Sequence, residues 1–153
     1  MNLEGKIALV TGASRGIGRA IAELLVERGA TVIGTATSEN GAAAISEYLG
    51  ANGKGLALNV TDVESMQSVL KTINDEFGAL DILVNNAGIT RDNLLMRMKD
   101  DEWTDIMDTN LTSIYRLSKA VLRGMMKKRN GRIINVGSVC CNNGNGGQPN
   151  PPG

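Results

Sequence analysis

Short apolar runs alternate along the chain with longer segments in which apolar residues recur every three or four positions. The short runs are almost continuously apolar, which is typical of parallel strands covered on both faces. The longer segments have the spacing of amphipathic helices. This alternation, with short links, predicts an α/β fold: a doubly wound parallel sheet with helices on both faces, truncated after the fifth strand. The predicted strands are Lys6 to Val10, Thr31 to Ala36, Gly55 to Asn59, Asp81 to Asn85 and Arg132 to Val136.

Three of the predicted helices have clear sequence signals. The first stops at Gly29, a residue type that commonly ends helices. The third opens with a capping box that starts at Thr61. The longest spans about Asp101 to Lys128, and its apolar positions are expected to lie in the core or at a subunit contact. The core-facing residues expected in the first helix are Ile17, Ala20, Ile21, Leu24 and Leu25.

A glycine-rich segment, Thr11 to Gly18, lies between the first predicted strand and the first predicted helix. Glycines let the backbone turn tightly and approach a pyrophosphate, while the helix N-terminus supplies N–H groups and a positive dipole end. We therefore expect a Rossmann-like sheet that binds a dinucleotide at this turn. The alternative is a turn that needs its glycines for geometry alone.

The end of the second predicted strand indicates which dinucleotide binds. NAD-binding folds usually carry an acid there, about 20 residues after the glycine turn, which binds the ribose 2′-hydroxyl. This chain has Thr35-Ala36-Thr37-Ser38 instead. Arg15 in the turn and the Thr37 hydroxyl suit a 2′-phosphate, which favours NADP(H). The alternative is that Arg15 is a solvated loop residue and Glu39 takes the role of the acid.

Composition and charge bound the class of protein. The chain has 153 residues, of which 42% are hydrophobic and 21% are charged, as expected of one globular domain. Sixteen basic residues balance 16 acidic ones, which gives no overall bias toward nucleic acid or an anionic membrane. There is no basic-then-apolar leader and no apolar run near the roughly 20 residues that span a bilayer. We expect a cytoplasmic protein without nucleic-acid or membrane partners.

Two absences narrow the chemistry. The chain has no histidine, which excludes a histidine-based nucleophile triad. Its two cysteines, Cys140 and Cys141, are adjacent and lack the spacing of a redox pair or a metal knuckle. We expect free thiols and no metal site, so any proton transfer must involve Tyr, Lys, Asp or Glu.

Four motifs together resemble the signatures of the short-chain dehydrogenase/reductase family. They are Thr11 to Gly18, Asn85 to Gly88, Asn110, and Gly137-Ser138. Within that family, Asn85 to Met98 and Met125 to Val139 are similar to the bacterial 3-oxoacyl-[acyl-carrier-protein] reductases. The resemblance covers residues 1 to 139 almost without interruption. It implies NADPH-dependent reduction of 3-oxoacyl thioesters in fatty-acid synthesis.

The resemblance also implies a role for each motif residue. Ser138 would hydrogen-bond the substrate carbonyl, and Asn110 would hold a water of the proton relay. The remaining positions would bind the cofactor from its phosphate end to its nicotinamide ribose. These cofactor residues are Gly12, Ser14, Arg15, Gly16, Ile17, Gly18, Thr37, Asn59, Val60, Asn86, Ala87 and Gly88.

The family mechanism further needs a Tyr as general acid and a Lys four residues later. The alignment puts the Tyr position at Pro151 and the Lys position beyond Gly153, so we expect the chain as given to lack turnover. We therefore divide it into an NADP-binding domain, 1–139, and an atypical Gly/Asn/Pro-rich tail, 140–153. A fragment with an altered end, a degenerate protein and part of a longer molecule all stay open.

Two classes of function follow from these observations. One is the reductase, or a short-chain reductase of another ketone. The other is a dinucleotide-binding fragment without turnover. An intact Tyr-x-x-x-Lys would separate them.

Two surfaces suggest partners. The cluster of Lys127, Lys128, Arg129 and Arg132 suits an acidic acyl carrier protein, although basic residues also complement the dipole at a helix end. The predicted fifth strand would be an uncovered edge, and Leu117 and Val121 on the long helix would be exposed. We therefore expect either a homo-oligomer joined through this edge and helix or a poorly soluble chain, and not the usual family tetramer.

Overall fold

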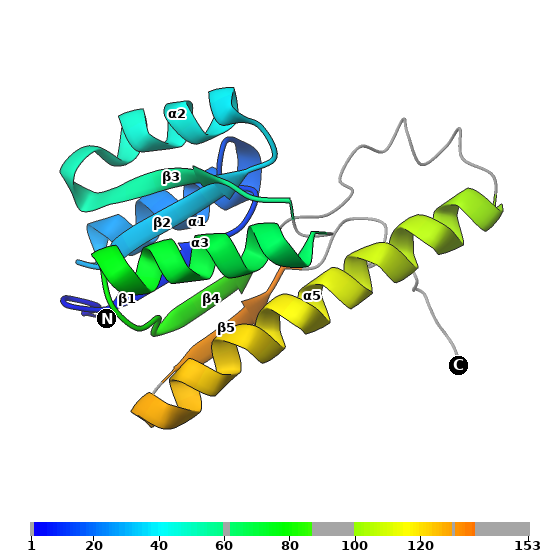
Figure 1. Cartoon of the computed structure of the whole chain (residues 1–153). Coiled ribbons are helices and arrows are strands. Elements are labelled where there is room, and N and C mark those ends of the chain that lie inside the picture. Colours follow the sequence, from blue (N-terminus) through cyan, green and yellow to red (C-terminus); the bar gives the residue numbers. More distant parts are fainter. Residues whose placement is uncertain (1, 60–61, 87–99, 130, 137–153) are drawn as a thin grey trace, which may run out of the picture.

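The computed structural model describes residues 2–59, 62–86, 100–129 and 131–136. The strands are β1 Ile7–Val10, β2 Thr31–Ala36, β3 Gly53–Ala57, β4 Ile82–Asn85 and β5 Arg132–Asn135, and the helices are α1 Gly16–Glu27, α2 Glu39–Leu49, the 3-10 turn η1 Gly50–Asn52, α3 Val63–Glu76 and α5 Asp100–Lys128. All strand pairs are parallel, in the order β3-β2-β1-β4-β5 (Figure 1). The predicted doubly wound parallel sheet is confirmed.

Helices cover both faces of the sheet because successive strand residues point to opposite sides. In β1, Ala8 and Val10 pack with α1 and α2, whereas Leu9 packs with α3 and α5. Figure 1 shows α3 and α5 side by side on one face, with α1 behind the sheet. These two apolar layers are the core, in which each fully buried aliphatic side chain contributes about 1.5–3 kcal/mol.

The buried face of α1 agrees with the predicted one only in part: Ile21 and Leu25 pack against the core, whereas Ala20 is exposed. Ala22 and Gly18 are buried, while Ile17 and Leu24 are 57% and 49% exposed. Small residues let the helix axis approach the sheet closely, so the helix is rotated toward them. The larger aliphatic residues lie at the margin of the contact or in solvent.

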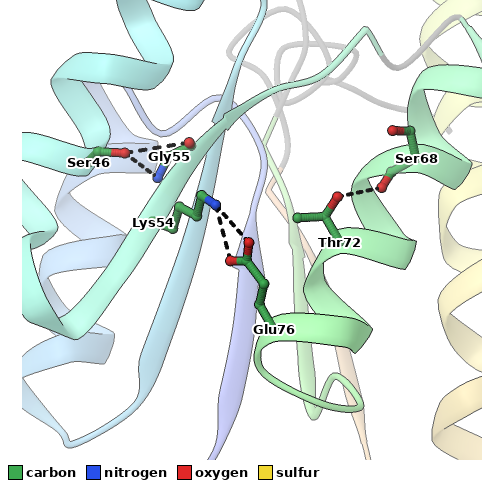
Figure 2. A network of polar contacts seen from close by, with 6 residues as sticks. All are labelled: Ser46, Lys54, Gly55, Ser68, Thr72 and Glu76. Carbon is green, nitrogen blue, oxygen red and sulfur yellow. Dashed lines mark hydrogen bonds and ion pairs between the residues drawn. The ribbon is translucent and has the colours of Figure 1, made fainter.

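Strand β3 begins and ends two residues earlier than predicted. A Cβ on Gly53 would overlap the Val32 carbonyl oxygen, and one on Gly55 would overlap the Ala42 carbonyl oxygen. Both glycines pair with β2 as part of the strand, and β2 and α2 approach them too closely for a side chain. Ser46 of α2 completes the contact: its Oγ accepts a 2.8 Å bond from the Gly55 N–H (Figure 2).

Helix α3 is capped by Asp62, one residue after the predicted start of the capping box at Thr61, which lies outside the described residues. The Asp62 carboxylate accepts bonds from the N–H groups of Glu64 and Ser65. At the other end of α3, Glu76 pairs with Lys54 of β3 at 3.0 Å (Figure 2). The two side chains are 40% and 45% exposed, so solvent screens the pair and it contributes only about 0.2–1 kcal/mol.

Asp81 aligns the amino ends of the three strands that carry the site. Its carboxylate accepts a 2.9 Å bond from the Ile7 N–H at the start of β1. Its backbone N–H donates to the Ile7 carbonyl, and its own carbonyl accepts from the Arg132 N–H at the start of β5. Asp81 thus joins the amino ends of β1, β4 and β5, and the pairing of these strands continues from there to their carboxyl ends.

The outer face of α5 differs from the expected one. Leu117 and Val121 are buried, so their expected exposure is wrong. Among the side chains of this region that the structure describes, the large apolar ones that are exposed are Tyr115, Leu122 and Met126 on α5 and Ile134 on β5. Among the described helices, none combines the length and the hydrophobicity needed to cross a membrane.

Candidate dinucleotide-binding site

The candidate site lies at the carboxyl ends of the central strands. The chain leaves β1 toward β2 on one side and β4 toward β5 on the other, so the strand order reverses between β1 and β4. Doubly wound sheets bind ligands in the crevice at such a switch point. The glycine turn follows β1 directly, and Asn86 follows β4.

The glycine turn has the shape that its sequence predicts. Gly12 and Gly16 both have φ +64°, which other residues rarely adopt. A Cβ on Gly18 would overlap the Gly12 carbonyl oxygen and lie 2.5 Å from Asn86 Nδ2. A Cβ on Gly16 would meet no atom within 4 Å, so Gly16 is needed for its backbone conformation and not for contact.

Hydrogen bonds tie the turn to β4. The Thr11 N–H donates to the Val84 carbonyl at 3.1 Å, and the Asn86 N–H donates to Thr11 Oγ1 at 2.8 Å. The Asn86 amide also donates to the Gly12 carbonyl at 3.2 Å. The two sides of the switch point are therefore joined by hydrogen bonds from both backbone and side chains.

A second set of bonds ties the turn to β2 and α2. The Ala13 N–H donates to the Thr35 carbonyl at 2.9 Å, and the Tyr48 hydroxyl donates to the Ala13 carbonyl at 2.6 Å. Burial raises the pKa of Tyr48 from its ordinary value to about 12, so the phenol keeps its proton to a higher pH than an exposed tyrosine does. The Arg19 guanidinium lies over the Tyr48 ring, 4.5 Å from its centroid.

The N-terminus of α1 is open to an anion. Arg15 precedes the helix with extended backbone and forms no side-chain cap, and no acidic residue lies in the first turn. The first N–H groups of the helix and its positive dipole end are thus available. Arg15 and Ile17 are exposed beside them. This open cradle and its positive end fit the pyrophosphate of a dinucleotide.

The predicted residues for the adenosine end follow β2 and β3. Thr37 is exposed one residue after β2, and Ser38 caps α2 by accepting from the Gly41 N–H at 3.1 Å. Ser14 lies close by, since a Cβ on Gly41 would be 3.7 Å from the Ser14 Cβ. Asn59 is exposed beyond β3, and its N–H donates to Ser65 Oγ at 3.1 Å.

A polar contact that the sequence interpretation missed joins β4, β5 and α5. The buried Asn85 amide donates to Asn135 Oδ1 at 2.8 Å and to Ser118 Oγ at 3.2 Å. Asn85 and Asn135 are register partners at the carboxyl ends of adjacent strands. Their spacing in the sequence gives no signal of this contact. Asn110 belongs to the same helix as Ser118, eight residues before it.

Several predicted site residues lie outside the described part of the chain. They are Val60, Ala87, Gly88, Ser138 and the tail 140–153, together with the side chains of Asn110 and Lys128.

Beyond α5, Arg129 is exposed with φ +60°. It lines an open, mainly apolar groove of about 430 Å³ together with Met126 and Arg132. This groove lies at the α5–β5 side of the sheet.

Comparison with known proteins agrees with the fold and the turn. A family model described as short chain dehydrogenase matches residues 6–150. The chain belongs to this family. Membership implies a nicotinamide dinucleotide as the ligand of the site.

Individual relatives are also highly similar. The chain is 87% identical over 150 residues to the 3-oxoacyl-[acyl-carrier-protein] reductase FabG of Vibrio harveyi. The aligned residues are 98% of this chain and 62% of that protein. This chain is 77% identical, with the same coverage, to the FabG protein of Escherichia coli (strain K12). The Pseudomonas aeruginosa FabG protein is 63% identical over 153 residues, again with 62% of that protein covered. The chain thus spans less than two thirds of the length of these relatives.

Proposed function

We propose that the chain is the NADP-binding part of a reductase that converts 3-oxoacyl-[acyl-carrier-protein] to 3-hydroxyacyl-[acyl-carrier-protein] in fatty-acid synthesis, in the cytoplasm. The observation that carries the proposal is the cradle formed by Gly12, Gly18 and Asn86, beside the open N-terminus of α1. The names of the relatives supply the substrate. Residues 1–139 form the NADP-binding domain in this proposal, and 140–153 form the tail.

The cofactor residues divide along the length of the dinucleotide. Gly12, Ser14, Gly16, Ile17 and Gly18 would hold the pyrophosphate through backbone N–H groups at the N-terminus of α1. This half of the proposal depends on the open helix end, whose first turn carries no acid to repel phosphate.

The other contacts specify NADP(H) over NAD(H). Arg15 and Thr37 would bind the 2′-phosphate, because both side chains are exposed and can donate hydrogen bonds to it. The end of β2 carries no acidic residue that would repel this phosphate. Asn59 and Val60 would contact the adenine. Asn86, Ala87 and Gly88 would lie toward the nicotinamide ribose, since they follow β4 at the switch point.

The reaction requires a hydride, which the bound NADPH would supply, and a proton. The family takes this proton from a Tyr whose position is Pro151 here, so the 153 residues contain no such donor for turnover. In this proposal Ser138 hydrogen-bonds the substrate carbonyl, and Asn110 holds a water of the proton relay. The roles of Ser138 and Asn110 follow from the family resemblance. The contact of Asn85 with Ser118 and Asn135 supports these roles, because it joins α5 to the end of β5. Asn110 belongs to α5, and Ser138 follows β5 in the sequence.

An acidic carrier protein is the proposed partner. The chain carries no Asp or Glu after Asp108, whereas seven basic residues follow. Arg129 and Arg132 lie at the open groove, and Lys128 precedes them at the end of α5. This charge suits the negatively charged surface of an acyl carrier protein. We further propose a homo-oligomer that uses the exposed apolar residues of α5.

Fluorescence titration with NADPH and NADH tests the proposed cofactor. The chain should bind NADPH more tightly than NADH, and Arg15→Ala should weaken NADPH binding about tenfold without affecting NADH. Arg28→Ala removes an exposed charge from the opposite end of α1 and should change neither affinity. Tighter or equal binding of NADH by the unmodified chain would refute the NADP assignment.

A further inference from the structure

The peptide unit between Ala13 and Ser14 lies within the glycine turn, and its carbonyl is held by a side chain from α2. The Tyr48 hydroxyl, 35 residues further along the chain, donates to this carbonyl at 2.6 Å. Tyr48 belongs to the last turn of α2 and packs against the same core cluster as Ala13. The phenol therefore connects a distant helix to the ligand-binding turn.

Peptide geometry gives this bond a directional consequence. In a planar trans unit, the C=O and the following N–H point in opposite directions. A carbonyl drawn toward Tyr48 therefore directs the Ser14 N–H away from Tyr48. Within the described residues, the Ser14 N–H donates to no other group.

The preceding peptide unit follows the same principle. The Gly12 carbonyl accepts from the Asn86 amide, and the Ala13 N–H on the opposite side of that unit donates to the Thr35 carbonyl. Side chains from outside the turn thus hold the carbonyls of two consecutive peptide units, those of Gly12 and Ala13. The Ala13 N–H is used within the fold, whereas the Ser14 N–H is left for a ligand.

The surroundings of Tyr48 keep its hydroxyl in place as a donor. Arg19 of α1 covers the ring at 4.5 Å and also contacts Glu23, one helical turn later. The phenol carries its proton throughout the neutral range, and burial extends this range upward by raising the pKa of Tyr48 to about 12.

We infer that Tyr48 is a positioning residue, which holds the Ala13 carbonyl so that the Ser14 N–H is oriented to bind the pyrophosphate of the dinucleotide. This inference deepens the proposed function and rests on it for the identity of the ligand. Tyr48 does not contact the ligand. It acts by setting the orientation of one peptide unit before the ligand arrives, and so reduces the reorganisation that binding requires.

The test compares Tyr48→Phe with Ile73→Val in the 153-residue chain. Tyr48→Phe keeps the ring under Arg19 and removes the hydroxyl. Ile73→Val removes one methyl from the opposite face of the sheet, as a control for modest loss of stability. The readouts, at a temperature where all three proteins are folded, are the amide NMR shift of Ser14 without ligand and the dissociation constant for NADPH.

We expect Tyr48→Phe to move the Ser14 amide signal and to weaken NADPH binding about fivefold, while Ile73→Val changes neither. An unchanged dissociation constant in Tyr48→Phe overturns the inference, even if Ser14 moves. Failure of the unmodified chain to bind NADPH overturns the proposed function instead. In that case the Ser14 signal still decides whether Tyr48 orients the peptide.

Discussion

Replacement of Gly18 by alanine tests the closest contact in the site. The added Cβ would overlap the Gly12 carbonyl oxygen and approach Asn86 Nδ2 to 2.5 Å. The overlapped group is backbone, so it cannot move aside as a flexible side chain would. The substitution must shift α1 away from β1 or break the bond from Asn86 to Gly12.

The expected cost follows from these two effects. Overpacking costs about 1–3 kcal/mol, and loss of the Asn86 bond adds about 1 kcal/mol. Gly18→Ala should therefore lower the free energy of unfolding by about 2–4 kcal/mol. In a chain of this size, that corresponds to a fall in Tm of about 10 °C. NADPH binding should be lost as well, because the cradle is displaced.

Two matched glycine substitutions separate this contact from general effects of adding a methyl group. Gly16→Ala meets no neighbour and should cost only about 1–2 kcal/mol for its left-handed backbone. Gly124→Ala lies in α5 with open space around it and should stabilise the chain by about 0.5–1 kcal/mol. Thermal and urea unfolding measure all three. If Gly18→Ala were as stable as the unmodified chain, the proposed packing of turn, helix and Asn86 would be wrong.

Two further predictions concern charge and pH. The pKa of Tyr48 is near 10 in the unfolded chain and about 12 in the folded one, so its contribution to the free energy of unfolding is complete below pH 10 and declines as the pH rises toward 12. Urea unfolding of Tyr48→Phe should lack that decline. Identical pH profiles of the two proteins would contradict the burial of the hydroxyl. Arg129→Glu should weaken binding of an acyl carrier protein in low-salt titrations. Lys71→Glu, which reverses an exposed charge on the neighbouring helix α3 away from the groove, should not. Equal effects of the two variants would indicate general charge attraction and contradict docking at Arg129.

The alternation of apolar runs predicted the fold because buried parallel strands and amphipathic helices leave distinct periodicities. The glycine turn was also predictable, since Gly12 and Gly16 occupy positions with positive φ. The start of β3 was not, because the prediction began the strand at Gly55, and only the pairing with β2 shows that Gly53 and Lys54 belong to it. The exposure of Ile17 and Leu24 was missed for a related reason: small residues set how α1 is rotated.

The polar contacts of the site were beyond the reach of pattern alone. Tyr48 looks like an ordinary member of an amphipathic helix, and its bond to Ala13 depends on how α2 packs. Asn85 and Asn135 meet only because the register of β4 and β5 places them side by side. Contacts of this kind follow from tertiary geometry and not from sequence spacing.

The most direct test of the proposed site is to map NADP⁺ binding by amide NMR perturbation in the 153-residue chain. The signals of Gly12, Ser14, Gly16, Gly18 and Asn86 should shift together and saturate with one dissociation constant. Signals of Met126 and Ile133, at the groove beside α5, should stay unchanged. Perturbations centred on that groove, or an absence of saturable shifts in the glycine turn, would contradict a dinucleotide site at the β1–β4 switch point.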